Sequence, residues 1–151
     1  MRILHTMFLM FIASFIVQYF LMSSIMANNF SNITNNLSKV YLSVIMGLYM
    51  VAIEIMMHDH QYNVFSIKYY GVLIFLLGIF IYLYRNQIAI NDKQYLEEMI
   101  EHHSMALLTS NEILKKTDDY NVTKLAKNII QKQEDEISIM KNIVKDIENK
   151  K

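Results

Sequence analysis

The chain has 151 residues, no cysteine, and 14 basic residues balanced by 14 acidic ones. The lack of cysteine excludes a disulfide scaffold and a thiolate metal site. Because the basic residues alternate with acidic ones and form no stripe, nothing indicates nucleic-acid binding. Residues 1–84 hold only three of the basic and two of the acidic residues, so we expect a membrane-type half followed by a water-exposed half. Proline is absent and glycine occurs three times, which predicts an all-α fold.

The first predicted element is an apolar helix over about residues 3–27. This segment has no formal charge if His5 is neutral, and it is long enough to cross the roughly 30 Å hydrocarbon core of a bilayer. A secretory signal peptide is the alternative, with Arg2 as its basic end. The run is long for a signal peptide, and the bulky Ile25 and Met26 make a poor cleavage site. We therefore interpret the segment as an uncleaved membrane anchor.

Two further apolar stretches complete a membrane region over residues 1–86. The Asn-rich segment 28–38 is predicted to be a loop, because its amides cannot be buried cheaply in lipid. Apolar helices follow at about 40–57 and 67–84, both near the short limit for a membrane span. The second of these carries tyrosines at its ends, as residues at a membrane interface do. The lipid bilayer is therefore the first expected partner.

The polar tail, residues 91–148, is predicted to form an amphipathic antiparallel helical hairpin. Asn91 or Asp92 can cap a helix that runs to about Lys116. A turn over residues 117–121 follows, with Asp119 or Asn121 as the next cap. The second helix extends from about residue 122 to 147. Two helices joined by so short a turn should fold back on each other.

A cluster of metal-ligand types lies on the first tail helix. Met99, His102 and His103 fall on one side of this helix, so a thioether and two imidazoles converge there. The second helix carries Gln133 and Glu136 on its otherwise apolar face, and both need polar partners. We expect the histidines to supply these partners, with Met140 nearby. The spacing alone also allows a surface histidine pair and methionines that only fill the core.

The order and spacing of these residues match a known family. The matching residues are Asp92, Tyr95, Met99-Ile100, His102-His103 and Ala106-Leu107-Leu108 in the first helix, and Leu125-Ala126, Ile129-Ile130, Gln133, Glu136-Ile137 and Met140 in the second. On these residues the tail resembles the DUF305 family, a ferritin-like helical group implicated in copper binding. The segment 41–57 is similar to the membrane region that precedes this domain in some bacterial members. Glu101 departs from the pattern, because those relatives usually have proline there.

The resemblance implies a membrane-anchored, non-catalytic protein of copper handling or resistance. Its metal residues would be Met99, His102, His103 and Met140, with Glu136 and Gln133 beside them. Thioether and imidazole donors suit Cu(I), the favoured ion, whereas imidazole with carboxylate would also accept Cu(II) or Zn(II). The resemblance further implies a multi-pass protein whose tail is extracytoplasmic. The count of Lys and Arg near the spans slightly opposes that orientation.

Two other functions stay open at this stage. A homodimer of hairpins could form a four-helix bundle in which the histidines, Gln133 and Glu136 make a buried polar network. Such a structural or interaction module would not respond to metal. A ferritin-like di-metal oxidase is disfavoured, because that chemistry needs paired Glu-x-x-His motifs and the second tail helix has no histidine.

Overall fold

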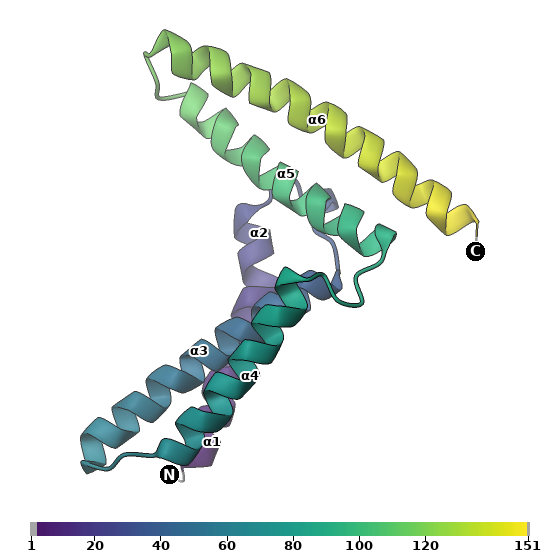
Figure 1. Ribbon diagram of the computed structural model, residues 1–151. Coiled ribbons are helices and arrows are strands. Elements are labelled where there is room, and N and C mark those ends of the chain that lie inside the picture. The colour runs from purple at the N-terminus through teal and green to yellow at the C-terminus, as the bar shows by residue number, and fades with distance from the viewer. Residues whose placement is uncertain (1–2, 151) are drawn as a thin grey trace. The chain divides into compact units, whose positions relative to one another are not determined.

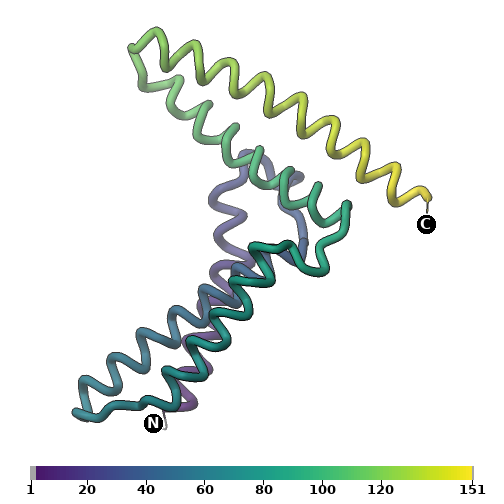
Figure 2. The backbone as a smooth tube through the Cα atoms, viewed as in Figure 1, coloured from purple at the N-terminus to yellow at the C-terminus, as the bar shows by residue number. Residues whose placement is uncertain are grey.

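The computed structural model describes residues 3–150, and every element in that range is a helix (Figures 1 and 2). The predicted all-α fold is confirmed, and Arg2 lies outside the described residues. The chain divides into two compact units. Met1–Met22 and Leu37–Ala89 make up what we call the apolar unit, and Ser23–Asn36 with Ile90–Lys151 make up the hairpin unit.

Three helical stretches have the length and apolar composition needed to cross a membrane. The first, Ile3–Met26, consists of α1 (Ile3–Ile16), a π-helical turn at Val17–Leu21 and α2 (Met22–Met26). The other two are α3 (Leu37–Tyr62) and α4 (Ile67–Arg85). All three predicted apolar helices are therefore present, and the first and third agree with their predicted ends to within a residue.

Helix α3 is longer than the predicted span at 40–57. It has 26 residues, about 39 Å of helix, and is therefore not a short span. The apolar pattern ends before His58, but the helix continues for another turn to Tyr62. Its end is fixed by Asp59, whose carboxylate accepts hydrogen bonds from the backbone N–H of Ser66 at 2.7 Å and from the Ser66 hydroxyl at 2.6 Å. These bonds close the turn between α3 and α4.

The apolar unit is held together by apolar packing on α3. Its core consists of Leu48, Val51 and Ile55 of α3 with Leu73 of α4, and Met7 and Phe11 of α1 pack against it. Gly47 lets α1 approach α3 closely: a Cβ atom at this position would lie 2.7 Å from the ring of Phe11 and 3.2 Å from the Phe11 carbonyl oxygen. The absence of a side chain at Gly47 therefore sets the distance between these two helices.

The hairpin unit is built on α5 (Asp92–Leu114) and α6 (Tyr120–Asn149), which lie side by side and antiparallel (Figure 1). Asn91 caps α5 in a reciprocal arrangement with Gln94, and Asp119 caps α6 by accepting from the N–H of Val122. Each cap is one of the two residues predicted for its position. Helix α5 ends two residues before the predicted Lys116, because its last carbonyls already bond to the N–H groups of the turn.

The facing sides of α5 and α6 form the core of the hairpin unit. This core consists of Ile100, Leu107, Ile137 and Met140, with Leu96, Met99, Ile130 and Val144 packed against it. The spacing of these residues is the helical repeat of three and four that predicted the hairpin. The core therefore fixes which residues of α5 lie opposite which residues of α6, and so positions the histidine cluster.

Candidate functional site

The core of the hairpin brings His103 of α5 against Glu136 of α6. The His103 Nδ1 atom lies 3.1 Å from the Glu136 Oε2 atom. His103 is 23% exposed and Glu136 is 52% exposed, so the pair lies at the edge of the core with one side open to solvent. The two residues are a charged pair only when the imidazole is protonated. The sequence predicted this meeting of histidine and carboxylate across the hairpin, and the structure confirms it.

The Nδ1 atom of His103 has an unusual environment. This atom is buried. Among residues 3–150 it makes no hydrogen bond, because the Glu136 oxygen is close enough for an ion pair but is not in the direction that a hydrogen bond requires. Buried polar atoms in proteins are almost always hydrogen-bonded, and an exception needs an explanation. A proton shared with Glu136 or a metal ion bound at this nitrogen would each provide one.

His102 does not join this pair. Its Nε2 atom lies 3.9 Å from the Glu98 Oε1 atom one turn earlier on the same helix, and its side chain is half exposed. Consecutive residues on a helix project about 100° apart, so packing His103 toward α6 turns His102 away from it. The prediction that the histidines are polar partners of Gln133 and Glu136 is therefore confirmed for His103 with Glu136, whereas His102 pairs with Glu98 on its own helix.

The two candidate methionines lie in and beside the apolar core. Met140 is one of its buried members, and Met99 packs against it one turn before His103. Gln133 is half-buried on the same side of α6, one turn before Ile137. The structure thus gathers Met99, His103 and Met140 on the facing sides of the two helices.

Among residues 3–150, no three histidine or carboxylate side chains lie close enough together to hold a metal ion. A site of several hard donors, as Zn²⁺ or a di-metal carboxylate centre needs, is therefore not assembled within the described chain. A site that uses thioether sulfur in place of carboxylates is a different case, since methionine is the soft donor that Cu(I) accepts.

The segment predicted as a plain loop is a structural part of the hairpin unit. It contains a short 3₁₀ helix at Phe30–Asn32. It is also hydrogen-bonded to α5 at two places along that helix. The Thr34 N–H donates to the Glu101 carboxylate at 2.9 Å, and the Thr34 hydroxyl donates to the Glu97 carbonyl at 2.8 Å. Glu101 therefore helps to bind the connector, which we define as residues 28–36.

Ser104 and Asn32 form the second point of attachment between the connector and α5. The Ser104 hydroxyl is fully buried and accepts from the backbone N–H of Asn28 at 2.9 Å and from the Asn32 side-chain amide at 3.2 Å. The Asn32 side-chain oxygen in turn accepts from the ammonium group of Lys141 on α6. Sequence reasoning missed these residues. The available signal was the recurrence of polar residues at 97, 101 and 104, which marks a second side of α5.

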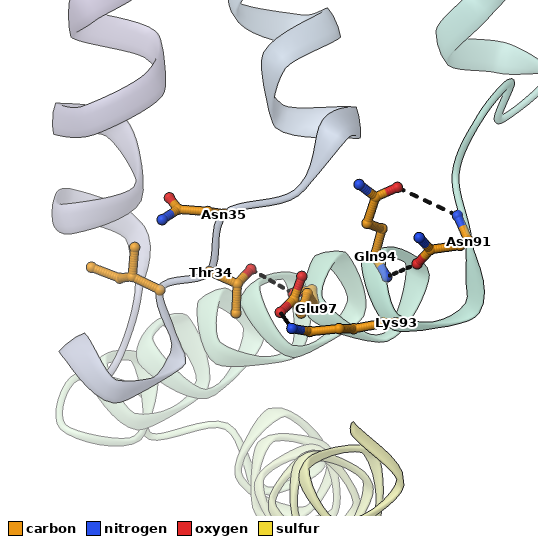
Figure 3. Close-up of a pocket in the computed structure, with 7 residues that line it drawn as sticks. Thr34, Asn35, Asn91, Lys93, Gln94 and Glu97 are labelled. Atoms are coloured by element: carbon orange, nitrogen blue, oxygen red, sulfur yellow. Dashed lines mark hydrogen bonds and ion pairs between the residues drawn. The ribbon is translucent and has the colours of Figure 1, made fainter. Parts of the chain in front are cut away.

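An open pocket lies where the connector meets the start of α5 (Figure 3). It is lined by Ile33, Thr34, Asn35, Asn91, Lys93, Gln94 and Glu97. Figure 3 shows the Asn91–Gln94 cap and the Lys93–Glu97 pair, whose charged atoms are 3.6 Å apart. Because its cation and its carboxylate pair with each other, the pocket presents no uncompensated charge to a ligand.

Lys93 also joins the open ends of the hairpin. Its ammonium group lies 2.7 Å from the Glu148 carboxylate near the end of α6. The hydrogen bond to Glu148, and then the negative charge of Glu97, raise the pKa of Lys93 above its ordinary value. At the opposite end, the hydrogen bond and charge of Lys115 lower the pKa of Glu112. Both helix ends thus carry favourable charge pairs.

The fold and the site together define a helical protein with three apolar, span-length helices and a two-helix domain. Residues 83–150 match the family described as domain of unknown function (DUF305). The chain is also 36% identical over 137 residues to the uncharacterized protein L153 of Acanthamoeba polyphaga mimivirus, an alignment that covers 90% of this chain and 89% of that protein. No solved structure matches.

The chain belongs to the DUF305 family. The predicted resemblance is thereby confirmed for the tail. The similarity to the viral protein extends well beyond the family domain, since residues 83–150 are only part of the aligned 137 residues. The sequence similarity therefore includes part of the apolar unit as well as the hairpin.

Proposed function

We propose that this chain is a membrane-anchored, non-catalytic protein that binds copper ions on its hairpin, with Cu(I) as the favoured state. The observation that carries the proposal is the buried Nδ1 atom of His103, which has no hydrogen bond among residues 3–150. An imidazole nitrogen kept free of hydrogen bonds in a partly apolar environment is a suitable donor for a soft cation.

The side chains around His103 fit this ion. Met99 lies one turn earlier on α5, and Met140 lies across the core on α6. Cu(I) takes thioether and imidazole donors, so it does not require the three-residue histidine and carboxylate cluster that is missing from residues 3–150. Glu136, whose carboxylate lies 3.1 Å from the same Nδ1 atom, would compensate the positive charge of an ion bound there. Gln133 would contribute from the same side of α6.

The proposed location is a multi-pass membrane protein with its hairpin on the extracytoplasmic side. Three helices have the length and composition of membrane spans, and if each crosses the bilayer the hairpin would lie on the side opposite the N-terminus. Ligands that lack thiols suit an oxidising compartment, where cysteine would form disulfides. Such a protein would store, sense or pass on copper as cargo.

The test is metal binding by the full chain purified in detergent. We expect about one Cu(I) per chain, or per assembly of chains, under reducing conditions with a competing chelator, and similar binding of Ag(I), which is not redox-active. His103→Ala should abolish most of the binding, and Met99→Leu, which keeps the volume but removes the sulfur, should weaken it.

The matched control is His102→Ala, which removes the neighbouring half-exposed imidazole. The geometry predicts a smaller loss for this variant than for His103→Ala. Copper binding should also raise the unfolding temperature of the unaltered chain, because a ligand that binds only the folded state stabilises it. Unchanged copper content in the double variant His102→Ala, His103→Ala would overturn the proposal.

A further inference from the structure

Helix α6 carries a second apolar stripe that α5 does not cover. Its positions alternate in steps of three and four residues through three heptads: Val122, Leu125, Ile129, Lys132, Glu136, Ile139 and Ile143. Leu125 is 60% exposed and Ile139 is 57% exposed, and the apolar residues at both ends of the stripe are exposed as well. We call this set the outer stripe. It lies about 100° around α6 from the residues that pack on α5.

Such spacing is the pattern of a helix that packs against two neighbours. One row of residues, including Ile137 and Met140, already packs against α5. The outer stripe repeats every three and four residues in the same way, which is the a and d spacing of a coiled coil. It extends for about 32 Å along the helix. An apolar row of this regularity is therefore suited to a second helix of matching length.

The two charged residues in the stripe identify that second helix. Lys132 and Glu136 lie at equal distances on either side of residue 134. If a second α6 runs antiparallel with its centre at residue 134, each Lys132 faces Glu136 of the other copy. The same register places Leu125 opposite Ile143 and Ile129 opposite Ile139. The six residues from Leu125 to Ile143 are thus complementary to themselves in both charge and apolar character, while Val122 would lie opposite Asp146, outside the stripe.

Parallel pairing lacks this complementarity. It would place lysine beside lysine and glutamate beside glutamate within the apolar contact, and like charges at such positions disfavour a pairing. Lys132 has no ion pair among the described residues, and Glu136 contacts His103 through Oε2 and is half exposed. Lys132 and the exposed part of the Glu136 carboxylate can therefore contact a second copy.

We propose that α6 pairs antiparallel with α6 of a second copy along the outer stripe, centred on residue 134. Two hairpins then form a four-helix unit, and the two His103–Glu136 pairs lie close to its two-fold axis. A lipid surface is the competing occupant of the stripe. It fits less well, because a carboxylate in the middle of an apolar stripe is repelled by anionic headgroups, whereas Lys132 of a second copy neutralises it. The pairing does not depend on metal binding.

Disulfide cross-linking tests the register directly, because the chain contains no cysteine of its own. The full-length variants Leu125→Cys and Ile143→Cys are made with different affinity tags, co-expressed, purified in detergent and oxidised with diamide. The expected product is a disulfide between the two different variants, with little product from either variant alone. Disulfides need Cβ atoms within about 4.5 Å, so the product reports on true neighbours.

Glu134→Cys is the matched control. This position lies at the proposed centre of the pairing but on the outward side of α6, so it should not cross-link to itself. Self-linking of Leu125→Cys would indicate parallel helices and overturn the proposal. A monomer by light scattering at all concentrations, together with quenching by spin-labelled lipid of a fluorophore attached to the Leu125→Cys variant, would assign the stripe to the bilayer surface instead.

Charge reversal provides a second, independent measurement. Lys132→Glu should raise the dissociation constant of the dimer about tenfold, since it places four carboxylates at the centre of the contact. The double variant Lys132→Glu, Glu136→Lys restores opposite charges and should recover most of the affinity. A double variant as weak as the single one would contradict the antiparallel register.

Discussion

Different interactions hold the helices together in the two units of this chain. In the apolar unit, α1 and α3 pack closely because Gly47 has no side chain, an apolar cluster joins α3 to α4, and the Asp59–Ser66 hydrogen bonds close the turn between them. In the hairpin unit, an apolar core between α5 and α6 is joined by a polar attachment, in which the connector bonds to Ser104 and Glu101. Close packing therefore holds the helices of the first unit together, whereas the second unit adds a hydrogen-bonded connector to its apolar core.

This difference follows from the solvent that each unit is suited to. A helix within lipid gains little from burying apolar surface, because lipid chains are themselves apolar, so close packing at small residues is what favours association. A helix in water gains from apolar burial and can also exchange water for internal hydrogen bonds at a modest net gain. Variants that disturb shape and variants that disturb hydrogen bonds should therefore have unequal effects in the two units.

The largest effect is expected from Gly47→Leu. A Cβ atom at this position would come within 3.2 Å of the Phe11 carbonyl oxygen, and a backbone atom cannot move away without separating α1 from α3. Overpacking of this kind costs about 3 kcal/mol. We expect a clear fall in the unfolding temperature of the full chain in detergent, followed by circular dichroism at 222 nm.

Gly71→Leu on α4 is the control for that variant. No atom lies within 4 Å of a Cβ placed at Gly71, so this change adds the same side chain without a clash. It should leave the unfolding temperature unchanged or raise it slightly, because leucine favours helix over glycine. Equal destabilisation by both variants would show that helix packing at Gly47 is not what holds the apolar unit together.

A smaller effect is expected from Ser104→Ala in the hairpin unit. The variant leaves the Asn32 side-chain amide without its acceptor and leaves the Asn28 N–H with only a 3.3 Å contact to the Ser104 carbonyl. Loss of a buried partner costs about 1 to 2 kcal/mol. Hydrogen exchange should show faster exchange at Asn28 and Thr34 in the variant, because the connector is less firmly attached to α5.

The control is Ser110→Ala, which removes another buried serine hydroxyl from the same helix at a position with no hydrogen bond to the connector. It should leave exchange in the connector unchanged. A double-mutant cycle with Asn32→Ala should give a coupling energy of about 1 kcal/mol, as residues in direct contact do. Additive effects would mean that the Asn32–Ser104 bond contributes nothing to the attachment.

The contrast between the units also explains what could be predicted from sequence. Apolar helices and the hairpin were predictable because their signals are local: a long apolar run, a helical repeat, and a cap such as Asn91 or Asp119. The meeting of His103 with Glu136 followed from these, since two helices and a short turn fix the register. Their role as metal ligands stays a prediction.

The remaining features depend on contacts between distant residues. Asn32 and Ser104 are separated by 72 positions, and no pattern near either one marks it as a partner of the other. The extension of α3 to Tyr62 depends on Asp59 bonding to Ser66 across a turn, whereas hydropathy records only the end of the apolar run. His102 and His103 looked equivalent in the sequence, and only packing against α6 distinguishes them.

The smallest effect is expected at the charged ends of the hairpin, at Lys93. Because Glu148 and Glu97 raise the pKa of Lys93 in the folded chain, its contribution to stability is complete below the ordinary lysine pKa of about 10.4. The contribution is lost as the pH rises through the higher pKa of the folded state. Lys93→Met should therefore lower the unfolding temperature slightly at pH 7, and the difference from the unaltered chain should vanish at strongly alkaline pH.

Lys124→Met, at an exposed position of α6 without an ion pair among residues 3–150, should show no such pH-dependent difference. If the Lys93 difference instead persists unchanged at high pH, the lysine stabilises the hairpin through packing of its methylene groups, and the ends of the hairpin are then held as the apolar unit is, by shape.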